Sequence, residues 1–413
     1  MKATIITIGD ELLIGQVVDT NSTWMAQQLN AIGIDVYRRI AVGDVHEDIL
    51  NVLQEAELSS DIILTTGGLG PTKDDITKHS LNQYFGGKLV INKEILDEVT
   101  SFFTRLNRPM LESNTLQAMV PDNCTAIHNK NGTAPGMWFE RYGKVFVSMP
   151  GVPFEMKGMM VDEIIPRLKK LVKSQFIIHK TVQTAGIGES FLAEKIKDFE
   201  NALPANVKLA YLPNLSLIRL RLTGHGANEA TLSKQMIALQ KELATQVGEF
   251  VFWLEDEPIE QIAGKLLLQN KATFSTAESC TGGYIAHRIT TVPGSSQYYI
   301  GSVIAYANEI KENMLGVKID TIEKYGAVSE ETVLEMAKHV RKEMKTDYAI
   351  AVSGIAGPDG GTPDKPVGTI WVGLADKDGV TAKKYFFNRA RMQNIELTCN
   401  YALIMLIKKL TSK

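Results

Sequence analysis

Four segments rich in glycine and hydroxyl side chains separate the apolar stretches of residues 276–371, and they constrain the fold more than any other feature. In order they read Thr276-Ala-Glu-Ser-Cys-Thr-Gly-Gly283, Val292-Pro-Gly-Ser-Ser296, Gly301-Ser-Val-Ile-Ala-Tyr-Ala-Asn308 and Gly354-Ile-Ala-Gly-Pro-Asp-Gly-Gly-Thr362. A packed core has no need of small polar residues where strands end, whereas a site that holds a small polar ligand against bare backbone needs them. This stretch therefore predicts a domain of strands and helices with a ligand site at the strand ends.

The overall composition narrows the class of protein. The chain has 413 residues, 44% of them apolar and 22% charged, which suits two or three folded domains. A net charge of −3 gives no electrostatic reason to expect nucleic acid as a partner. Three widely separated cysteines, Cys124, Cys280 and Cys399, do not predict a disulfide framework. Residues 1–8 read as a strand rather than a signal peptide, and no apolar run has membrane-spanning length, so we expect a soluble cytoplasmic protein without a membrane partner.

Apolar strand patterns alternate with amphipathic helical patterns in the first 170 residues, and this rhythm predicts a layered α/β sheet. The expected strands are 2–8, 61–66 and 144–149, and the expected helices lie near 20–31, 46–58, 75–85 and 155–172.

Residues 176–252 have a different pattern, which predicts a small α+β unit. Its expected strands are 177–184, 207–211 and 216–223, and its expected helices are 189–200 and 227–247. The polar segment Glu255-Asp-Glu-Pro258 predicts a linker into a second α/β domain that begins with a helix at 259–269. The predicted domains are therefore residues 1–170, 171–253 and 254–413.

Glycine and carboxylate side chains follow several expected strands of the first domain. Gly9-Asp10-Glu11 follows one strand, Gly43-Asp44 follows another, and Gly67-Gly-Leu-Gly70 leads through Asp74 and Asp75 into a helix. Glycines let backbone N–H groups approach an anion, and the helix N-terminus adds partial positive charge. The carboxylates favour a hard divalent cation, which takes oxygen ligands. Asp74 and Asp75 alone are equally well explained as helix caps, but the strand ends together favour a binding site.

A serine and a lysine of the last domain form a candidate catalytic pair. Ser296 precedes the expected strand 299–306, and Lys311 falls in the first turn of a helix that Asn308 is expected to cap. The helix N-terminus disfavours an ammonium by only about 0.3–1 kcal/mol, so burial or another cation must provide most of the shift to a working pKa near 7–8. A neutral Lys311 can take the proton of Ser296, with Tyr306 as a proton relay or as a hydrogen-bond partner of the leaving group.

Alternative interpretations of these residues stay open. Ser296 is also a typical turn residue, and Ser279 and Thr281 can be helix caps. Ser279 is the second candidate nucleophile, and Cys280 is the third because a helix N-terminus stabilises a thiolate. The glycines at 282–283 weaken a helix start by roughly 1 kcal/mol each relative to alanine. A ligand held against their N–H groups would explain that cost.

Taken together, the motifs resemble the CinA family, also called competence/damage-inducible protein A. The segments Gly9-Asp-Glu-Leu-Leu-Ile-Gly15, Asp19-Thr-Asn21, Thr65-Thr-Gly-Gly-Leu-Gly-Pro-Thr72, Asn131-Gly-Thr-Ala-Pro-Gly136 and Pro150-Gly-Val-Pro153 resemble its molybdopterin-binding-like domain. The four segments of residues 276–371 resemble its nicotinamide-nucleotide amidase domain. The resemblance covers nearly the whole chain and implies an α/β fold class with a molybdopterin-binding-like layered domain, a small α+β KH-type middle domain and an α/β amidase domain.

The middle domain departs from an RNA-binding KH module. It has no GxxG loop, because Gly186-Ile-Gly188 has the wrong spacing. We therefore expect a spacer or dimerisation element there.

The resemblance implies three sets of site residues. Substrate contacts in the amidase domain are expected from Glu278, Thr281, Gly282, Gly283, Asn308, Gly354, Ala356, Gly357, Gly361, Thr362 and Arg391. Substrate contacts in the first domain are expected from Gly9, Asn21, Thr66, Gly67, Gly68, Leu69, Gly70, Asn131, Gly132 and Thr133. Metal ligands are expected from Asp10, Asp44, Asp74 and Asp75.

Arg391 is the candidate clamp for a 5′-phosphate, because guanidinium groups bind phosphate bidentately. The family usually has Gly-Asp before this arginine and a basic residue four positions after it. This chain has Arg389-Ala390 and Ile395 instead.

The resemblance implies two activities. The last domain would convert nicotinamide mononucleotide to nicotinic acid mononucleotide and ammonia without a cofactor. The first domain would hydrolyse ADP-ribose to AMP and ribose 5-phosphate with a divalent metal of the Mg, Mn or Co type, alone or with potassium. We expect a homodimeric enzyme of pyridine-nucleotide salvage. The alternative is a nucleotide-binding protein without turnover that acts through partners in competence or the DNA-damage response.

Overall fold

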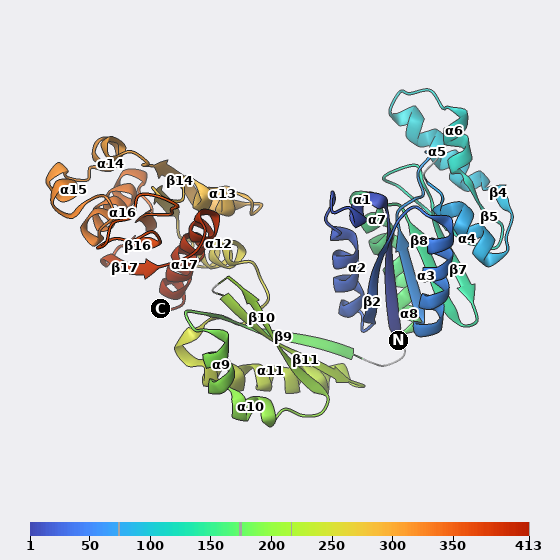
Figure 1. Cartoon of the computed structure of the whole chain (residues 1–413), viewed down its shortest axis with the longest axis horizontal. Helices are drawn as coiled ribbons and strands as arrows, with labels where there is room; N and C mark the ends of the chain where they lie inside the picture. Colours follow the sequence, from blue (N-terminus) through green and yellow to red (C-terminus); the bar gives the residue numbers. More distant parts are fainter. Residues whose placement is uncertain (73–74, 173–175, 216, 413) are drawn as a thin grey trace. The chain divides into compact units, whose positions relative to one another are not determined.

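The fold is given by a computed structural model that describes residues 1–72, 75–172, 176–215 and 217–412 (Figure 1). Contacts within the chain divide it into two compact units, residues 1–178 with 223–235 and residues 179–222 with 236–413. Among the described residues, no helix is both long and apolar enough to cross a membrane.

A six-stranded sheet forms the first domain, in the order β2-β1-β3-β8-β7-β6. Its strands are β1 (Lys2–Ile8), β2 (Asp35–Val42), β3 (Ile62–Thr66), β6 (Thr125–Ile127), β7 (Gly136–Arg141) and β8 (Lys144–Met149). The first four in spatial order run parallel, whereas β7 pairs antiparallel with both β8 and β6. The carboxyl ends of the four parallel strands therefore meet at one edge, here called the N-domain edge.

Both faces of this sheet are buried at its central strands β1, β3 and β8, which explains why these strands are largely apolar, whereas the edge strand β2 is mostly exposed. Ile62 of β3 packs in one core with Met25, whereas the next residue, Ile63, packs in the other core with Leu53. Alternate residues of a strand point to opposite faces, so one short strand serves both cores. The helices of this domain are α1 (Asp10–Leu13), α2 (Thr20–Ala31), α3 (His46–Ser59), α4 (Thr77–Phe85), α5 (Lys93–Arg105), α6 (Glu112–Gln117), α7 (Pro153–Met159) and α8 (Ile165–Leu171).

Two parts of the first domain differ from the sequence expectation. The helix expected at 155–172 is α7 and α8 joined by a π-helical turn, η1 (Met160–Ile164). Residues 89–121 form a small unpredicted layer in which β4 (Leu89–Ile91) pairs with β5 (Met119–Pro121), with α5 and α6 between them in sequence. Strands of three residues are too short to show a period-two pattern.

A four-stranded sheet in the order β10-β11-β9-β12 forms the middle domain, with its helices on one face (Figure 1). Burial alternates along β11, as a sheet covered on one face requires. The strands are β9 (Phe176–Ala185), β10 (Val207–Asn214), β11 (Leu217–Gly226) and β12 (Val251–Trp253). The helices are α9 (Glu189–Lys195), α10 (Lys197–Asn201), α11 (Glu229–Val247) and the 3₁₀ turn η2 (Gly248–Phe250).

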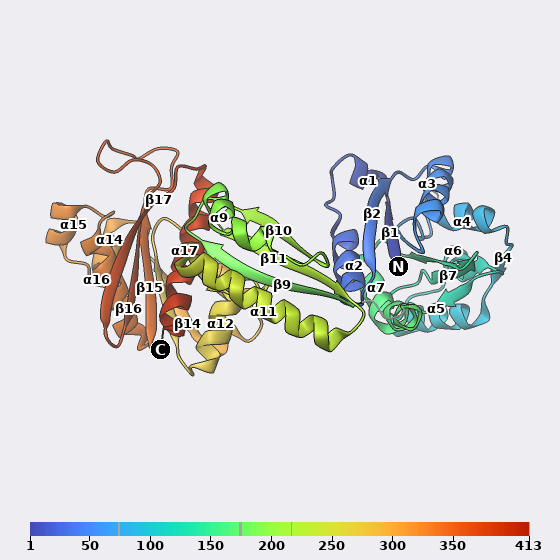
Figure 2. The same cartoon turned by 90° about the horizontal axis from the view of Figure 1, so that it is seen from below.

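A five-stranded sheet in the order β14-β13-β15-β16-β17 forms the last domain. Figure 2 shows α17 on one side of this sheet and α14 to α16 on the other. The strands are β13 (Phe274–Glu278), β14 (Tyr299–Ile304), β15 (Tyr348–Gly354), β16 (Thr369–Asp376) and β17 (Gly379–Phe386). The helices are α12 (Ile259–Gln269), α13 (Tyr284–Thr290), η3 (Ser295–Gln297, 3₁₀), α14 (Asn308–Leu315), α15 (Ile319–Tyr325), α16 (Glu330–Met344) and α17 (Arg391–Thr411).

The strand directions bring distant segments of the last domain to one edge of its sheet. Strands β14 and β15 both run parallel to β13, while β16 is antiparallel to β15 and β17 is antiparallel to β16. The loops that follow β13, β14, β15 and β17 therefore lie at the same edge, here called the C-domain edge. The start of α17 lies there too, because it follows β17.

Replacing Gly67 with alanine is expected to destabilise the first domain. Its φ is +117°, and an added Cβ would lie 2.0 Å from the carbonyl oxygen of Ile8. Because that neighbour is backbone, we expect a loss of at least about 3 kcal/mol in the free energy of unfolding. Gly86→Ala is the control, since its φ is +70° but no atom lies within 4 Å of the added Cβ, and about 1–2 kcal/mol is expected. Urea unfolding measures both, and equal losses would contradict the argument.

Candidate functional site

The N-domain edge gathers most of the residues expected to bind a ligand there. Gly9 and Asp10 follow β1, Asp44 follows β2, and the Gly67–Gly70 loop follows β3. Residues 128–135 connect β6 to β7 and reach the same edge, because β7 starts opposite the end of β8. The topology therefore brings these segments together as the sequence predicted.

Asp10 and Asp44, two of the expected metal ligands, are joined by two hydrogen bonds, each from the backbone N–H of one residue to the side-chain carboxylate of the other. The Asp10 N–H donates to Asp44 Oδ2 at 3.2 Å, and the Asp44 N–H donates to Asp10 Oδ1 at 3.2 Å. Burial raises the pKa of Asp44, and the nearby charges of Asp10, Glu11 and Asp75 raise it further. Because these carboxylates repel one another when they are ionised, a cation bound between them would stabilise their charged forms.

The other two expected metal ligands stand differently. Asp75 accepts hydrogen bonds from the N–H and the hydroxyl of Thr72, so it closes the loop that precedes α4. Asp74 lies outside the described residues. Among the described residues, no group of three or more His, Cys, Asp or Glu side chains is arranged to hold a metal ion. The metal site stays a prediction.

Several expected ligand contacts hold the edge together instead. The Thr66 hydroxyl is buried and donates to the Pro150 carbonyl at 2.7 Å, while Asn21 Nδ2 donates to the Gly151 carbonyl at 2.7 Å. Leu69 is a core residue, 2% exposed. The Asn21 side-chain oxygen is buried and has no hydrogen-bond partner among the described residues.

The Asn131–Thr133 loop is fixed by a carboxylate that the sequence reasoning missed. Asn129 Nδ2 donates to Glu155 Oε2 at 2.6 Å, and Asn129 Oδ1 accepts from the Asn131 N–H at 3.1 Å. A Cβ at Gly132 would lie 2.2 Å from the same carboxylate, and burial raises the pKa of Glu155. A side chain at position 132 would therefore require the Glu155 carboxylate to move.

A carboxylate buried at the end of β13 organises the C-domain edge. Glu278 is 0% exposed, and its oxygens accept from the N–H groups of Gly283 at 3.1 Å, Ile285 at 3.0 Å and Ala286 at 2.8 Å. The Thr281 hydroxyl also donates to Glu278, at 2.6 Å. These bonds give partners to backbone N–H groups at the start of α13, which otherwise have none within the helix. The negative charge of the carboxylate also interacts favourably with the partial positive charge at that helix end. Glu278 and Thr281 thus position the loop, which differs from the direct substrate contact expected for them.

Gly282 and Gly283 are needed for their backbone conformation. Their φ values are +59° and +98°, in the left-handed region that favours glycine. The Gly283 N–H is already bonded to Glu278, and the Gly282 N–H donates to the Ser279 carbonyl at 3.1 Å. The expectation that these two N–H groups face a ligand is therefore wrong.

Lys311 is buried at the C-domain edge, as its proposed role requires. It is 1% exposed, and its Nζ donates to the carbonyls of Ala305 at 2.9 Å and Tyr306 at 3.1 Å. Burial lowers the pKa of Lys311. The expected direction and main cause are confirmed. The expected cap is wrong, because Asn308 is the first helical residue and Ala307 precedes it without a capping side chain.

Ser296 lies at the wrong end of β14 to meet Lys311. It belongs to η3, which precedes β14, whereas Lys311 follows the other end of that strand. The six residues of β14 rise by about 17 Å. Pairing of Tyr299 with Phe274 and of Ile304 with Glu278 confirms which end is which. The predicted Ser296–Lys311 pair is therefore wrong.

Ser279 lies at the correct edge. It directly follows Glu278, whose carbonyl accepts from the Ala305 N–H at 2.8 Å, and the Ala305 carbonyl in turn binds Lys311. Its own N–H donates to Val352 of β15 at 3.1 Å. Ser279 is thus held at the end of β13. Hydrogen bonds from the Ala305 N–H to Glu278 and from the Lys311 amine to Ala305 connect its segment to the lysine.

Cys280 is a poor nucleophile in this setting. Its side chain is buried, and burial raises the pKa of the thiol to about 12 despite the nearby charges of Lys311 and Arg391. The thiol therefore stays protonated at neutral pH, and the thiolate expected at a helix N-terminus does not form.

Arg391 connects three segments of the C-domain edge. Its Nη1 donates to the Gly357 carbonyl at 2.7 Å, and its Nη2 donates to the Tyr306 hydroxyl at 3.2 Å. The guanidinium is exposed and has further donors for a phosphate. The Tyr306 hydroxyl is therefore held at Arg391, whereas the Tyr306 group that Lys311 binds is the backbone carbonyl.

The loop after β15 is anchored by a residue that the sequence reasoning missed. Asn394 is 0% exposed, and its Nδ2 donates to the carbonyls of Ala356 at 3.0 Å and Arg389 at 2.9 Å. The only signal for Asn394 in the sequence is its position one helical turn after Arg391. The rest of the loop, including Gly361 and Thr362, is exposed.

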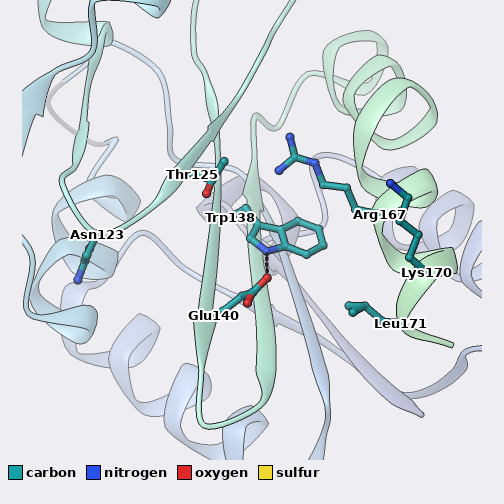
Figure 3. Close-up of a pocket in the computed structure, with 7 residues that line it drawn as sticks. All are labelled: Asn123, Thr125, Trp138, Glu140, Arg167, Lys170 and Leu171. Carbon is teal, nitrogen blue, oxygen red and sulfur yellow. Dashed lines mark hydrogen bonds between the residues drawn. The ribbon is translucent and has the colours of Figure 1, made fainter. Parts of the chain in front are cut away.

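Figure 3 shows a separate hollow on the first domain, formed by β6, β7 and α8. It is open, with a volume of about 470 Å³. Two of its polar side chains are paired: Trp138 Nε1 donates to Glu140 at 3.0 Å, and Arg167 donates to Glu163 at 2.6 Å. This hollow lies away from the N-domain edge, because Glu140 pairs with Val145 near the start of β8.

The domain comparisons agree with this architecture. Residues 4–170 match the family described as probable molybdopterin binding domain, residues 179–252 match the damage-inducible protein CinA KH domain, and residues 256–410 match the CinA C-terminal domain. These matches confirm the three-part fold class expected from the sequence. The precise domain boundaries stay predictions.

Full-length relatives match the whole chain. A CinA-like protein of Cytophaga hutchinsonii is 46% identical over 407 residues, covering 98% of this chain and 97% of its own. A CinA-like protein of Flavobacterium psychrophilum is 45% identical over 412 residues, covering 99% of both. A crystal structure of the competence/damage inducible protein CihA from Agrobacterium tumefaciens is 37% identical, covering 36% of this chain and 94% of that one, with a TM-score of 0.35.

Glu278→Gln is expected to destabilise the last domain by about 2–4 kcal/mol. The amide keeps one acceptor oxygen and turns an NH₂ group toward backbone N–H donors that the carboxylate now satisfies. Chemical unfolding followed by circular dichroism measures the loss. Glu309→Gln is the matched control, because Glu309 is exposed in the first turn of α14. An unchanged stability of Glu278→Gln would show that the four hydrogen bonds are dispensable.

Proposed function

Because the chain belongs to the CinA family, we propose that residues 254–413 hydrolyse the carboxamide of nicotinamide mononucleotide to nicotinic acid mononucleotide and ammonia. The observation that carries this proposal is the buried Lys311 amine, held by two backbone carbonyls beside the loop of Ser279. No carboxylate is paired with Lys311 among the described residues, and a lysine with a lowered pKa is better suited to proton transfer.

Ser279 is the proposed nucleophile. Its hydroxyl attacks the amide carbon, and its proton passes to Lys311. The proton then goes to the departing nitrogen, which leaves as ammonia as the C–N bond breaks. Water then attacks the resulting acyl-serine while Lys311 takes one of its protons, and as the C–O bond to Ser279 breaks Lys311 returns that proton to the serine oxygen, which releases the acid product. Ser296 has no part in this mechanism.

Backbone groups of the same loop are suited to hold the oxyanion. The Thr281 N–H has no hydrogen-bond partner among the described residues, and the Cys280 N–H is bonded to its own thiol, whereas those of Gly282 and Gly283 are bonded to other residues. The N–H groups of Cys280 and Thr281 follow Ser279 directly, as oxyanion donors do in other serine-based hydrolases. Arg391 at the same edge is the proposed contact for the 5′-phosphate.

We further propose that the first domain hydrolyses ADP-ribose to AMP and ribose 5-phosphate. The support is the group of carboxylates at the N-domain edge, where Asp10 and Asp44 are joined and Asp75 lies near enough to raise the pKa of Asp44. Carboxylate oxygens are the ligand type that a hard divalent cation takes, and such an ion, when bound, would neutralise charge on a pyrophosphate. Asn21 and the Gly67–Gly70 loop are the proposed contacts for the nucleotide.

Ser279→Ala and Lys311→Met are each expected to lower ammonia release from nicotinamide mononucleotide by about 10²–10⁴-fold. The first removes the nucleophile and the second removes the proton acceptor while keeping an apolar stem of similar length. Ser296→Ala is the matched control and is expected to retain the wild-type rate. A coupled assay for ammonia on the full chain measures all three. Loss of activity in Ser296→Ala alone would restore the discarded pair, and no ammonia from the wild type would favour binding without turnover.

The amidase rate is expected to rise with pH. Only neutral Lys311 accepts a proton, so activity appears as pH rises through the pKa of Lys311 and is lost as pH falls through it. Burial lowers that pKa, so the midpoint of kcat/KM should lie below the ordinary lysine value of about 10.4. A pH–rate profile of the wild type tests this. A midpoint at or above the ordinary value would contradict it, and Lys311→Arg should show no such rise.

Asp44→Asn is expected to lower metal-dependent hydrolysis of ADP-ribose at least about tenfold, because it removes one charge from the proposed cation site. Production of AMP with Mg²⁺, Mn²⁺ or Co²⁺, with and without potassium, is the measurement. Asp35→Asn, at an exposed position at the start of β2, is the control. Equal rates in Asp44→Asn and the wild type would remove this carboxylate from the mechanism.

A further inference from the structure

Strand β14 is an edge strand that carries no charged residue. It lies at one end of the five-stranded sheet and pairs only with β13 in the part of the chain that the structure describes. Its sequence, Tyr299-Ile-Gly-Ser-Val-Ile304, is apolar or small throughout, and the side chains of Ile300 and Ile304 are 53% and 52% exposed. An exposed apolar edge of this kind is a template for pairing with another strand.

The other edge strands are protected against such pairing. Strand β2 carries Arg38 and Arg39, and β17, at the opposite end of the same sheet as β14, carries Lys383 and Lys384. Strand β10 contains Pro213, and β4, β5, β6 and β12 have three residues each. Charge, proline and short length are the usual means by which an edge avoids pairing. Among the strands that the structure describes, β14 is the edge strand that has none of them.

The backbone of β14 offers hydrogen bonds on its outer side. The Ala305 N–H, just beyond the strand, donates inward to the Glu278 carbonyl at 2.8 Å. Alternate residues of a strand present their backbone groups to opposite sides, so those of Ser302 and Ile304 point outward. The register shift in the ladder with β13 lies at the N-terminal end of the strand, so residues 301–304 form a regular edge.

A second copy of the same strand is the partner that this edge fits. When two identical strands pair antiparallel about a two-fold axis, a charge near the axis faces the same charge of the other copy, which is destabilising. Strand β14 has no charge and avoids this repulsion, whereas β2 and β17 would oppose arginines or lysines. It also has no charged side chain with which to select a charged strand of another protein.

We propose that β14 pairs antiparallel with β14 of a second copy, which joins two five-stranded sheets across a two-fold axis. The outward backbone groups of Ser302 and Ile304 bond to those of the second copy, and the Ile304 side chain is removed from water. Ile304 also lies beside the loop after β13, because its Cδ1 is 3.0 Å from the position of a Cβ added to Gly283. The interface therefore adjoins the C-domain edge of each copy. It belongs to the last domain rather than to the middle domain.

Sedimentation velocity of the full chain over a range of concentrations tests the interface. The wild type is expected to be a dimer. Ile304→Lys should raise the dimer dissociation constant at least about 100-fold, because it places two like charges at the interface. Phe386→Lys is the matched control, since Phe386 is 57% exposed on β17, the opposite edge strand of the same sheet. It should keep the wild-type dissociation constant. Thermal unfolding shows whether each variant is folded.

Hydrogen exchange provides a second measurement that needs no variant. The amides of Ser302 and Ile304 are expected to exchange at least about tenfold more slowly in the dimer than after dilution to the monomer, because the second copy supplies their acceptors. The amides of Val303 and Ala305 point toward β13 and should exchange equally in both states. This measurement decides if Ile304→Lys does not fold.

Three results would overturn the proposal. The first is a wild type that stays monomeric at every concentration, which would leave the edge free for a different partner. The second is a folded Ile304→Lys variant with the wild-type dissociation constant, which would place the interface on another part of the chain. The third is equal exchange of the Ser302 and Ile304 amides in dimer and monomer. The interface does not rest on the proposed reactions, so a dimer that releases no ammonia would remove the amidase proposal alone.

Discussion

Glu278 accepts hydrogen bonds from three backbone N–H groups at the start of α13, and the geometry of the C-domain edge depends on that contact. A helix N-terminus buried without partners is unfavourable, and a fully buried carboxylate is unfavourable as well. Here each group satisfies the other. The short segment between Glu278 and α13 carries Ser279, so the serine hydroxyl is held on a rigid support rather than on a mobile loop.

The two α/β domains place a buried lysine in the same way. Lys78 lies in the first turn of α4 and Lys311 in the first turn of α14, and each amine is bonded to two backbone carbonyls. Helix N-termini disfavour cations, and burial disfavours them more. Neutral carbonyls stabilise the amine without fixing its charge as a carboxylate would, so both lysines can exchange a proton.

The sequence was sufficient for much of the fold. Strands such as β1 and β8 are apolar because both of their faces are buried, and such runs are easy to recognise. The layer of residues 89–121 was missed because β4 and β5 have three residues each. For the same reason the burial of Lys78 was invisible, since residues 116–119, which cover it, lie almost forty positions further along the chain.

The candidate site was predicted only in part, and Ser296 shows why. The spacing from Ser296 to Lys311 is short in sequence, but a whole strand lies between them, and a strand carries its two ends to opposite edges of a sheet. Glu278 was misassigned for a different reason. A carboxylate at the end of a strand can face a ligand or its own backbone, and only the fold decides which.

The two carbonyls that hold Lys311 also determine the direction in which it can act. A neutral amine has two N–H groups and one lone pair, and the carbonyls of Ala305 and Tyr306 occupy both N–H groups. The lone pair must then point away from both oxygens. The backbone thereby orients the basic orbital before any substrate arrives, and the amine needs no rearrangement to receive a proton.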